Sequence, residues 1–144
     1  MNSSKTISIL NRLYILFHRS LPMYLRDAGP WTRMQEKTAE QTLAHIIEDH
    51  EAACDRLGTM ILDRNGVIES GRFPMEFTSW NDLSFDFILQ RLIELQRRAI
   101  RTLEQSVLEL EHDPAARTVV EELLGEAQGH LDSLLDLTGQ TAGA

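Results

Sequence analysis

Apolar side chains recur at steps of three and four residues along four separate stretches of the chain, and this spacing is the strongest constraint on its fold. Residues with such spacing share one face of an α-helix, so each stretch predicts an amphipathic helix with one buried face. A chain of 144 residues is long enough for one domain with a substantial core and too short for two. We therefore expect an all-α fold in a single domain.

The predicted helices have recognisable ends. They span, in chain order, residues 7–24, 32–64, 85–110 and 114–137. Thr32 and Gln35 form a capping-box pattern at the start of the second helix, which ends at Asn65 and Gly66. Asp113 precedes Pro114 as an N-cap residue precedes proline at a first helical position. Residues 139–144 contain too few apolar side chains to fold, so we expect the domain to cover 1–138 and the rest to be a disordered tail.

The connections between the helices differ in length. Those joining the first helix to the second and the third to the fourth are short, so each pair is expected to form an antiparallel hairpin. Residues 66–84 join the second and third helices and are numerous enough to run the length of the domain. The apolar residues of this connection include Phe73, Met75, Phe77 and Trp80, which must cover either a groove of the domain or a second subunit.

The net charge and the cysteine content limit which binding partners and which cellular compartment are expected. The chain has 22 acidic and 14 basic residues, a formal net charge of -8, which argues against binding nucleic acid or an anionic membrane. Cys54 is the only cysteine, so no intrachain disulfide can form and a reducing cytoplasm is the expected compartment. Arg12 interrupts the apolar run near the N-terminus and Arg19 follows it, so we expect neither a signal peptide nor a membrane span.

Three short motifs on the predicted helices resemble one family. They are Leu10-Asn11 with Tyr24 on the first helix, the sequence ACDRL at 53–57 on the second, and GHLD at 129–132 on the fourth. With the single long connection, they resemble the ferritin-like superfamily, and bacterioferritin within it, from about Leu10 to Leu137. The resemblance implies a ferritin-like antiparallel four-helix bundle with one long crossover and a di-iron centre. It also implies a haem at the subunit interface and dimers that pair through the first two helices and the crossover.

The chain departs from the ligand pattern of that family, which supplies one Glu from each of two helices and Glu-x-x-His from each of the other two. Phe17 falls at the glutamate position of the first helix. His50 and Ala53 fall at the Glu and His positions of the second helix. On the fourth helix, Ala127 replaces the glutamate and only His130 matches, while Glu126 lies about 100° away around the helix.

The third helix offers two candidates for the remaining glutamate position. Counting back from the fourth helix without gaps points to Glu94, which would keep a carboxylate. Periodicity points to Gln96, because Gln96 lies on the same face as Leu92, Ala99 and Leu103 and Glu94 lies roughly opposite. We choose Gln96, and the inner layer then contains no carboxylate.

These departures set the expected chemistry. Two iron ions a few ångströms apart need several carboxylates to offset their repulsion, so we expect no ferroxidase activity and no resident cofactor. A site for iron or another transition metal would use His50, His130 and Gln96, with Glu94 and Glu126 as alternatives. We expect no haem, because Glu51 stands where the family has its haem-ligating methionine. For His50 and His130, the simplest expectation is two buried imidazoles paired with each other, with Gln96 or with water.

The expected function follows from the loss of the metal ligands. We expect a cytoplasmic protein that self-associates as a homodimer and works by binding or as a structural element, without contacting nucleic acid or membrane. The alternative is a metal-binding protein of iron or other transition-metal handling, related to iron storage and ferroxidase proteins. The crossover and the shortness of the tail are the features that suggest a dimer rather than a larger shell.

Overall fold

The structure is all-helical over the residues that it describes. The computed structural model describes residues 2–28, 37–80 and 84–142, and no strand occurs within them. The elements in chain order are α1 (Asn2–His18), α2 (Leu21–Ala28), α3 (Lys37–Asp63), the 3-10 helix η2 (Met75–Trp80), α4 (Phe85–Glu109) and α5 (Pro114–Ala142). The predicted all-α class is confirmed.

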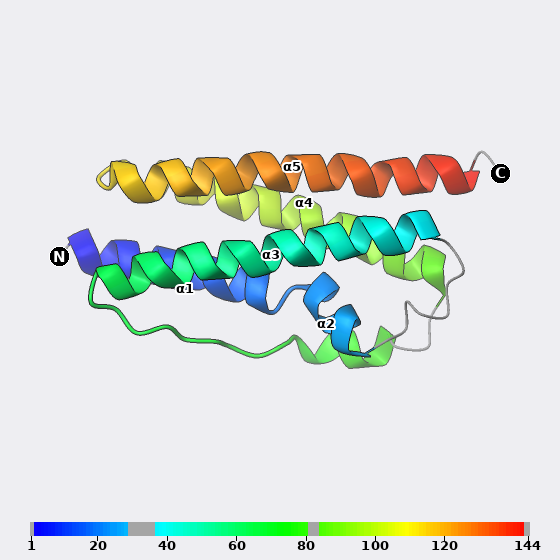
Figure 1. The fold of residues 1–144 in the computed structure, drawn as a ribbon, viewed down its shortest axis with the longest axis horizontal. Helices are drawn as coiled ribbons and strands as arrows, with labels where there is room; N and C mark the ends of the chain where they lie inside the picture. The colour runs from blue at the N-terminus through cyan, green and yellow to red at the C-terminus, as the bar shows by residue number, and fades with distance from the viewer. Residues whose placement is uncertain (1, 29–36, 81–83, 143–144) are drawn as a thin grey trace.

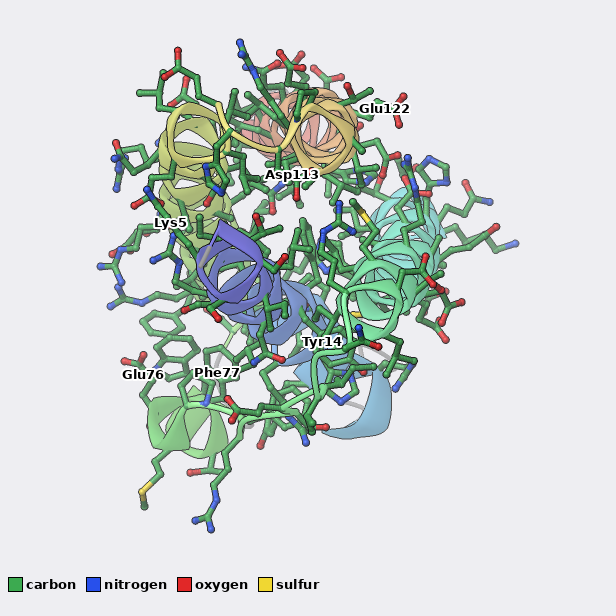
Figure 2. The ribbon with its side chains drawn as sticks, turned by 90° about the vertical axis from the view of Figure 1, so that its left-hand side faces the viewer. Lys5, Tyr14, Glu76, Phe77, Asp113 and Glu122 are labelled. Atoms are coloured by element: carbon green, nitrogen blue, oxygen red, sulfur yellow. The ribbon has the colours of Figure 1, made fainter. Side chains whose placement is uncertain are left out.

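The long helices lie side by side along one axis (Figure 1). α1 and α5 run in one direction, and α3 and α4 run in the other. Seen from the end, the four helices occupy the corners of a square, with α4 beside α5 and α1 beside α3 (Figure 2). α3 also contacts α5 and α1 contacts α4, so each of the four packs against two antiparallel neighbours and their apolar faces meet in the middle.

The N-terminal helix is broken where a continuous helix over 7–24 is predicted. α1 ends at His18, and α2 begins at Leu21. Pro22 has no backbone N–H to donate to the carbonyl of His18, and its ring excludes a straight continuation of the helix. Ser20 caps the new helix, because its Oγ accepts a hydrogen bond from the Met23 N–H at 3.4 Å. The prediction of one helix was wrong because it gave too little weight to this proline.

The other helix ends follow ordinary capping chemistry. α3 ends in a Schellman motif: Asn65 has φ 62°, and the Gly66 N–H donates to the Ile61 carbonyl at 2.9 Å. Asp113 caps α5, because its Oδ1 accepts from the Ala116 N–H, and the same carboxylate pairs with Arg64 at 3.0 Å. These ends agree with the predicted ones, whereas the predicted capping box at 32–35 lies outside the described residues.

The C-terminal helix is longer than predicted. α5 continues through Ala142, so residues 139–142 are helical where we predicted a disordered tail. The side chains up to Leu137 are buried on the inward face, and the helix then extends one further turn beyond its last buried leucine. The predicted end was too early because it was based on apolar content alone. Once a helix is packed, each further residue adds a backbone hydrogen bond, so the helix can extend beyond its last buried side chain.

The connection after α3 is held against α1 by side-chain and backbone hydrogen bonds. The buried Asn11 accepts from the Glu69 N–H at 2.7 Å and donates to the Glu69 carbonyl at 3.3 Å. Arg19 donates to the Ser70 carbonyl at 3.1 Å. Gly71 has φ 64° and lies so close to Ile15 that a Cβ atom would approach its side chain to 2.8 Å. The connection is therefore part of the packed structure along this edge.

The aromatic residues of the connection cover the chain's own helices. Phe77 of η2 is only 2% exposed, and its ring packs against Tyr24, Phe73 and Trp80 at centroid distances of 5.4 to 6.4 Å. η2 lies on the side of the molecule opposite α5 (Figure 2). The connection was expected to cover either a groove of the domain or a second subunit. Phe77 covers a groove of its own chain, whereas Met75 is 88% exposed. None of the helices within the described ranges is both long and apolar enough to cross a membrane.

We predict that Phe77→Ala lowers the free energy of unfolding by about 3 to 5 kcal/mol, the usual cost of removing a buried aromatic ring. Met75→Ala is the matched control in the same short helix, and it should change stability by less than about 0.5 kcal/mol because the side chain is exposed. Urea denaturation followed by circular dichroism measures both. Equal effects of the two substitutions would mean that η2 does not pack on the helices in this way.

Candidate functional site

A level of polar side chains divides the core into two apolar clusters. One cluster includes Phe17 on α1 and Ala127 on α5, and the other begins at Leu21 on α2 and resumes at Leu134 on α5. The polar residues that fall between the clusters on successive helices are Ser20, His50, Gln96 and His130. Because buried polar groups are costly unless they are hydrogen-bonded, the partners of these four residues determine what the level can do.

His50 of α3 is paired with the helix break. Its Nδ1 lies 2.9 Å from Ser20 Oγ, and the edge of its ring meets Phe17 at a centroid distance of 5.1 Å. Burial, with a smaller contribution from His130, lowers the pKa of His50 from 6.5 to about 3. His50 is therefore neutral at physiological pH. Ser20 Oγ already accepts from Met23, so its hydroxyl hydrogen is free to be donated to Nδ1, which favours the tautomer with hydrogen on Nε2.

Gln96 of α4 lies inside, and Glu94 lies outside. The Gln96 amide donates to the backbone carbonyl of Ala127 at 3.0 Å across the interior. Glu94 is 44% exposed and pairs with Arg91 and Arg98 on its own helix. The periodicity argument for the third predicted helix thus placed both residues as the structure does, and Glu94 is too far around the helix to join the interior level.

The interior level does not fit a dinuclear iron centre. Phe17, Ala53 and Ala127 stand at three of the ligand positions that the ferritin-like resemblance implies, and all three are buried against other core residues. Gln96 uses its amide to bond Ala127, and no side chain at this level between the two clusters is a carboxylate among the described residues. Two cations placed there would meet two neutral imidazoles and an aromatic ring, which cannot offset their charge.

His130 of α5 faces a carboxylate of α3. Its Nε2 is buried and lies 2.9 Å from Asp49 Oδ2, so the Asp49 carboxylate is its close polar contact, although the pair does not meet the geometry of a hydrogen bond. Burial lowers the pKa of His130, although Asp49 acts in the opposite direction, so the ring is neutral near pH 7. A neutral imidazole lone pair and a carboxylate oxygen this close repel each other unless a proton or a metal ion lies between them.

Glu126 completes a three-residue cluster with Asp49 and His130. Their ligand atoms all lie within 4.8 Å of one another. Glu126 and His130 are four residues apart on α5 and therefore share a face of that helix. Burial and the nearby Asp49 carboxylate raise the pKa of Glu126. His45, one turn before Asp49 on α3, lies at the rim, with its Nε2 3.6 Å from Asp49 Oδ2 and its side chain 69% exposed.

The sequence predictions for this region need two corrections. The two histidines were expected to pair with each other, with Gln96 or with water; their rings meet edge to face at a centroid distance of 6.3 Å, but their close polar contacts are with Ser20 and Asp49. Asp49, which none of the sequence predictions places at the site, is only 29% exposed and lies against His130. The signal that could have found the cluster is the i, i+4 spacing of His45 with Asp49 and of Glu126 with His130.

Comparison with known proteins adds no family assignment. No protein-family model matches the chain, and no curated protein matches it.

We predict that His50 destabilises the fold in acid. Its folded pKa lies below the unfolded value, so the unfolded state binds a proton between about pH 6.5 and pH 3 while the folded state does not. The free energy of unfolding should therefore be fully retained above pH 6.5 and fall by up to about 1.4 kcal/mol per pH unit through that window. His50→Gln should flatten this slope in denaturant titrations at successive pH values. An unchanged slope would show that His50 is protonated in the folded protein.

Proposed function

We propose that this protein is a ferritin-like four-helix bundle that has lost the di-iron centre and binds one transition-metal ion between α3 and α5. The antiparallel packing of α1, α3, α4 and α5 and the long connection from α3 to α4 support the ferritin-like architecture. The observation on which the metal proposal rests is the cluster of three ligand atoms, from Asp49, Glu126 and the buried His130, that all lie within 4.8 Å of one another.

The donor set favours a divalent first-row transition metal. One imidazole nitrogen and two carboxylate oxygens suit Zn²⁺, Co²⁺, Ni²⁺ or Fe²⁺, whereas Ca²⁺ and Mg²⁺ prefer oxygen alone. With metal–ligand bonds of about 2.0 to 2.2 Å, neighbouring donors of a tetrahedral site lie roughly 3.4 Å apart. The His130–Asp49 distance of 2.9 Å would lengthen slightly, and exposed Glu126 would move inward. His45 is within reach as a fourth ligand after a side-chain rotation.

The proposed site differs from the di-iron centre that the family resemblance implies. Asp49 and Glu126 each lie one residue before a ligand position that the resemblance implies. A single ion at the Asp49 cluster has no second metal ion beside it, and a dinuclear site needs both ions to stabilise the reacting oxygen atoms. The proposed activity is therefore metal binding, as in storage, delivery or structural stabilisation, without oxidation of iron.

Self-association is the second part of the proposal. Leu62 and Val67 flank the turn at the end of α3 and are 58% and 78% exposed, so they offer apolar surface to a second copy in a homodimer. Light scattering should give the mass of two chains, and the mass of one chain would remove the dimer from the proposal. The single Cys54 is buried, and burial raises its pKa to about 12, which is consistent with the proposed cytoplasmic location.

We predict that chelator-treated protein binds one Co²⁺ per chain, seen as visible absorption of the ion in a low-symmetry site and by calorimetry, and that Zn²⁺ displaces it. Asp49→Asn, which preserves side-chain shape, should weaken binding at least about tenfold, and His130→Ala should abolish it. His45→Ala should weaken it less.

The matched control is Glu122→Gln. Glu122 lies one turn before Glu126 on α5, but it pairs with Arg56 and does not belong to the cluster (Figure 2). This variant should bind Co²⁺ as the wild type does. Absence of stoichiometric binding to the wild type, or equal loss in Glu122→Gln and Asp49→Asn, would refute the site.

A further inference from the structure

A cavity of about 290 Å³ opens between the helix break, α4 and the connection that contains η2. Its lining comes from the end of α1, the start of α2, the middle of α4 and residues 72–77. The side chains at its inner end, Phe17, His50 and Gln96, are buried, whereas Arg72 and Arg98 on the lining are exposed. The cavity therefore leads from the surface to the polar level of the core, on the side of His50 away from the Asp49 cluster.

The lining combines apolar walls with positive charge. Leucine, isoleucine, phenylalanine and proline side chains make up most of the wall, and three arginines join them: Arg19, Arg72 and Arg98. Among the described residues, no aspartate or glutamate lines the cavity. In a chain of net charge -8, three cations without a lining anion form a locally positive opening.

The three arginines are not equally available. Arg98 pairs with Glu94, and Arg19 donates to the Ser70 carbonyl and lies over the ring of Phe73 at 4.9 Å. The Arg72 side chain forms no hydrogen bond or ion pair with a described residue. Arg72 is therefore the cation best able to bind an incoming anion, because it loses no existing partner when it does so.

The volume limits the size of an occupant. A dry apolar cavity of roughly 150 Å³ holds one benzene molecule, so about twice that volume accommodates roughly a dozen non-hydrogen atoms. An apolar wall of this size favours a hydrocarbon, and the arginines favour an acidic group at one end. The neutral His50 and the bonded Gln96 at the inner end add no charge that would exclude hydrocarbon.

We propose that this cavity binds a medium-chain monocarboxylate of about eight to ten carbons, with its chain against the apolar wall and its carboxylate on Arg72 at the opening. Binding is reversible and involves no covalent step. The proposal is independent of the metal site, because the cavity and the Asp49 cluster share no residue. A carboxylate pairs with a guanidinium in a bidentate manner, which gives the chain one orientation.

The test is calorimetric titration of the wild-type protein at neutral pH with decanoate below its micellar concentration. Decanol has the same hydrocarbon chain without the negative charge, and acetate has the carboxylate without the long hydrocarbon chain. We expect one decanoate per chain, at least about tenfold weaker binding of decanol, and no measurable binding of acetate.

Two variants locate the site. Arg72→Gln should weaken decanoate binding about tenfold and leave decanol binding unchanged. Arg97→Gln is the matched control, because Arg97 is exposed on α4 but does not line the cavity, and it should bind decanoate normally. Ala99→Leu fills part of the cavity with a side chain from α4 and should block both ligands while the protein remains folded.

Several results would overturn the proposal. They are absence of decanoate binding to folded wild-type protein, equal affinity for decanol and decanoate, and equal effects of Arg72→Gln and Arg97→Gln. Sedimentation of the protein with phosphatidylglycerol vesicles, without binding of monomeric decanoate, would assign the positive opening to a lipid surface instead. Loss of Co²⁺ binding in Asp49→Asn leaves this proposal unaffected, so the two proposals can fail separately.

Discussion

The hydrogen bond between Ser20 and His50 joins the break in the N-terminal helix to the polar level of the core. Ser20 can make this bond because Pro22 ends α1, which frees the serine to serve both as the cap of α2 and as the partner of a buried imidazole. A continuous helix would turn Ser20 to another position and leave His50 with an unsatisfied polar atom, at a cost of about 1 to 3 kcal/mol. The break also opens the space between α1, α2 and α4 that becomes the cavity.

The polar level of the core consists of neutral side chains that pack against their neighbours. Phe17 packs against the ring of His50, and Gln96 spans the interior to the backbone of Ala127, so His50 and Gln96 each have one polar atom hydrogen-bonded within the chain. His130 is the exception, because its Nε2 turns outward to Asp49 without aligned hydrogen bonding. A buried imidazole nitrogen that faces two carboxylates is an arrangement that a proton on the ring or a bound cation stabilises.

The sequence predicted several features that are set within a single helix, but it missed the break in the N-terminal helix and the contacts that depend on how the helices pack together. The inward position of Gln96 and the outward position of Glu94 followed from helical periodicity, and Asp113 marked the start of α5, because both depend on neighbours within one helix turn. Pro22 favours a helix break, but the prediction missed the break at Ser20. The reason is that the apolar spacing continues across the break through Leu21 and Leu25. Asp49 was missed because its role depends on how α3 and α5 are rotated against each other, which no single-helix pattern contains.

The central claim is that the interior of this fold does not support a pair of metal ions and that the proposed ion lies at the Asp49 cluster. The most direct measurement is the rate of Fe²⁺ oxidation in air, followed by oxygen uptake as increasing amounts of iron are added per chain. We predict that oxidation is no faster than in protein-free buffer at every iron-to-chain ratio, because Phe17, Ala53 and Ala127 occupy the positions of the required ligands. A rapid phase that saturates at two Fe²⁺ ions per chain would contradict the account.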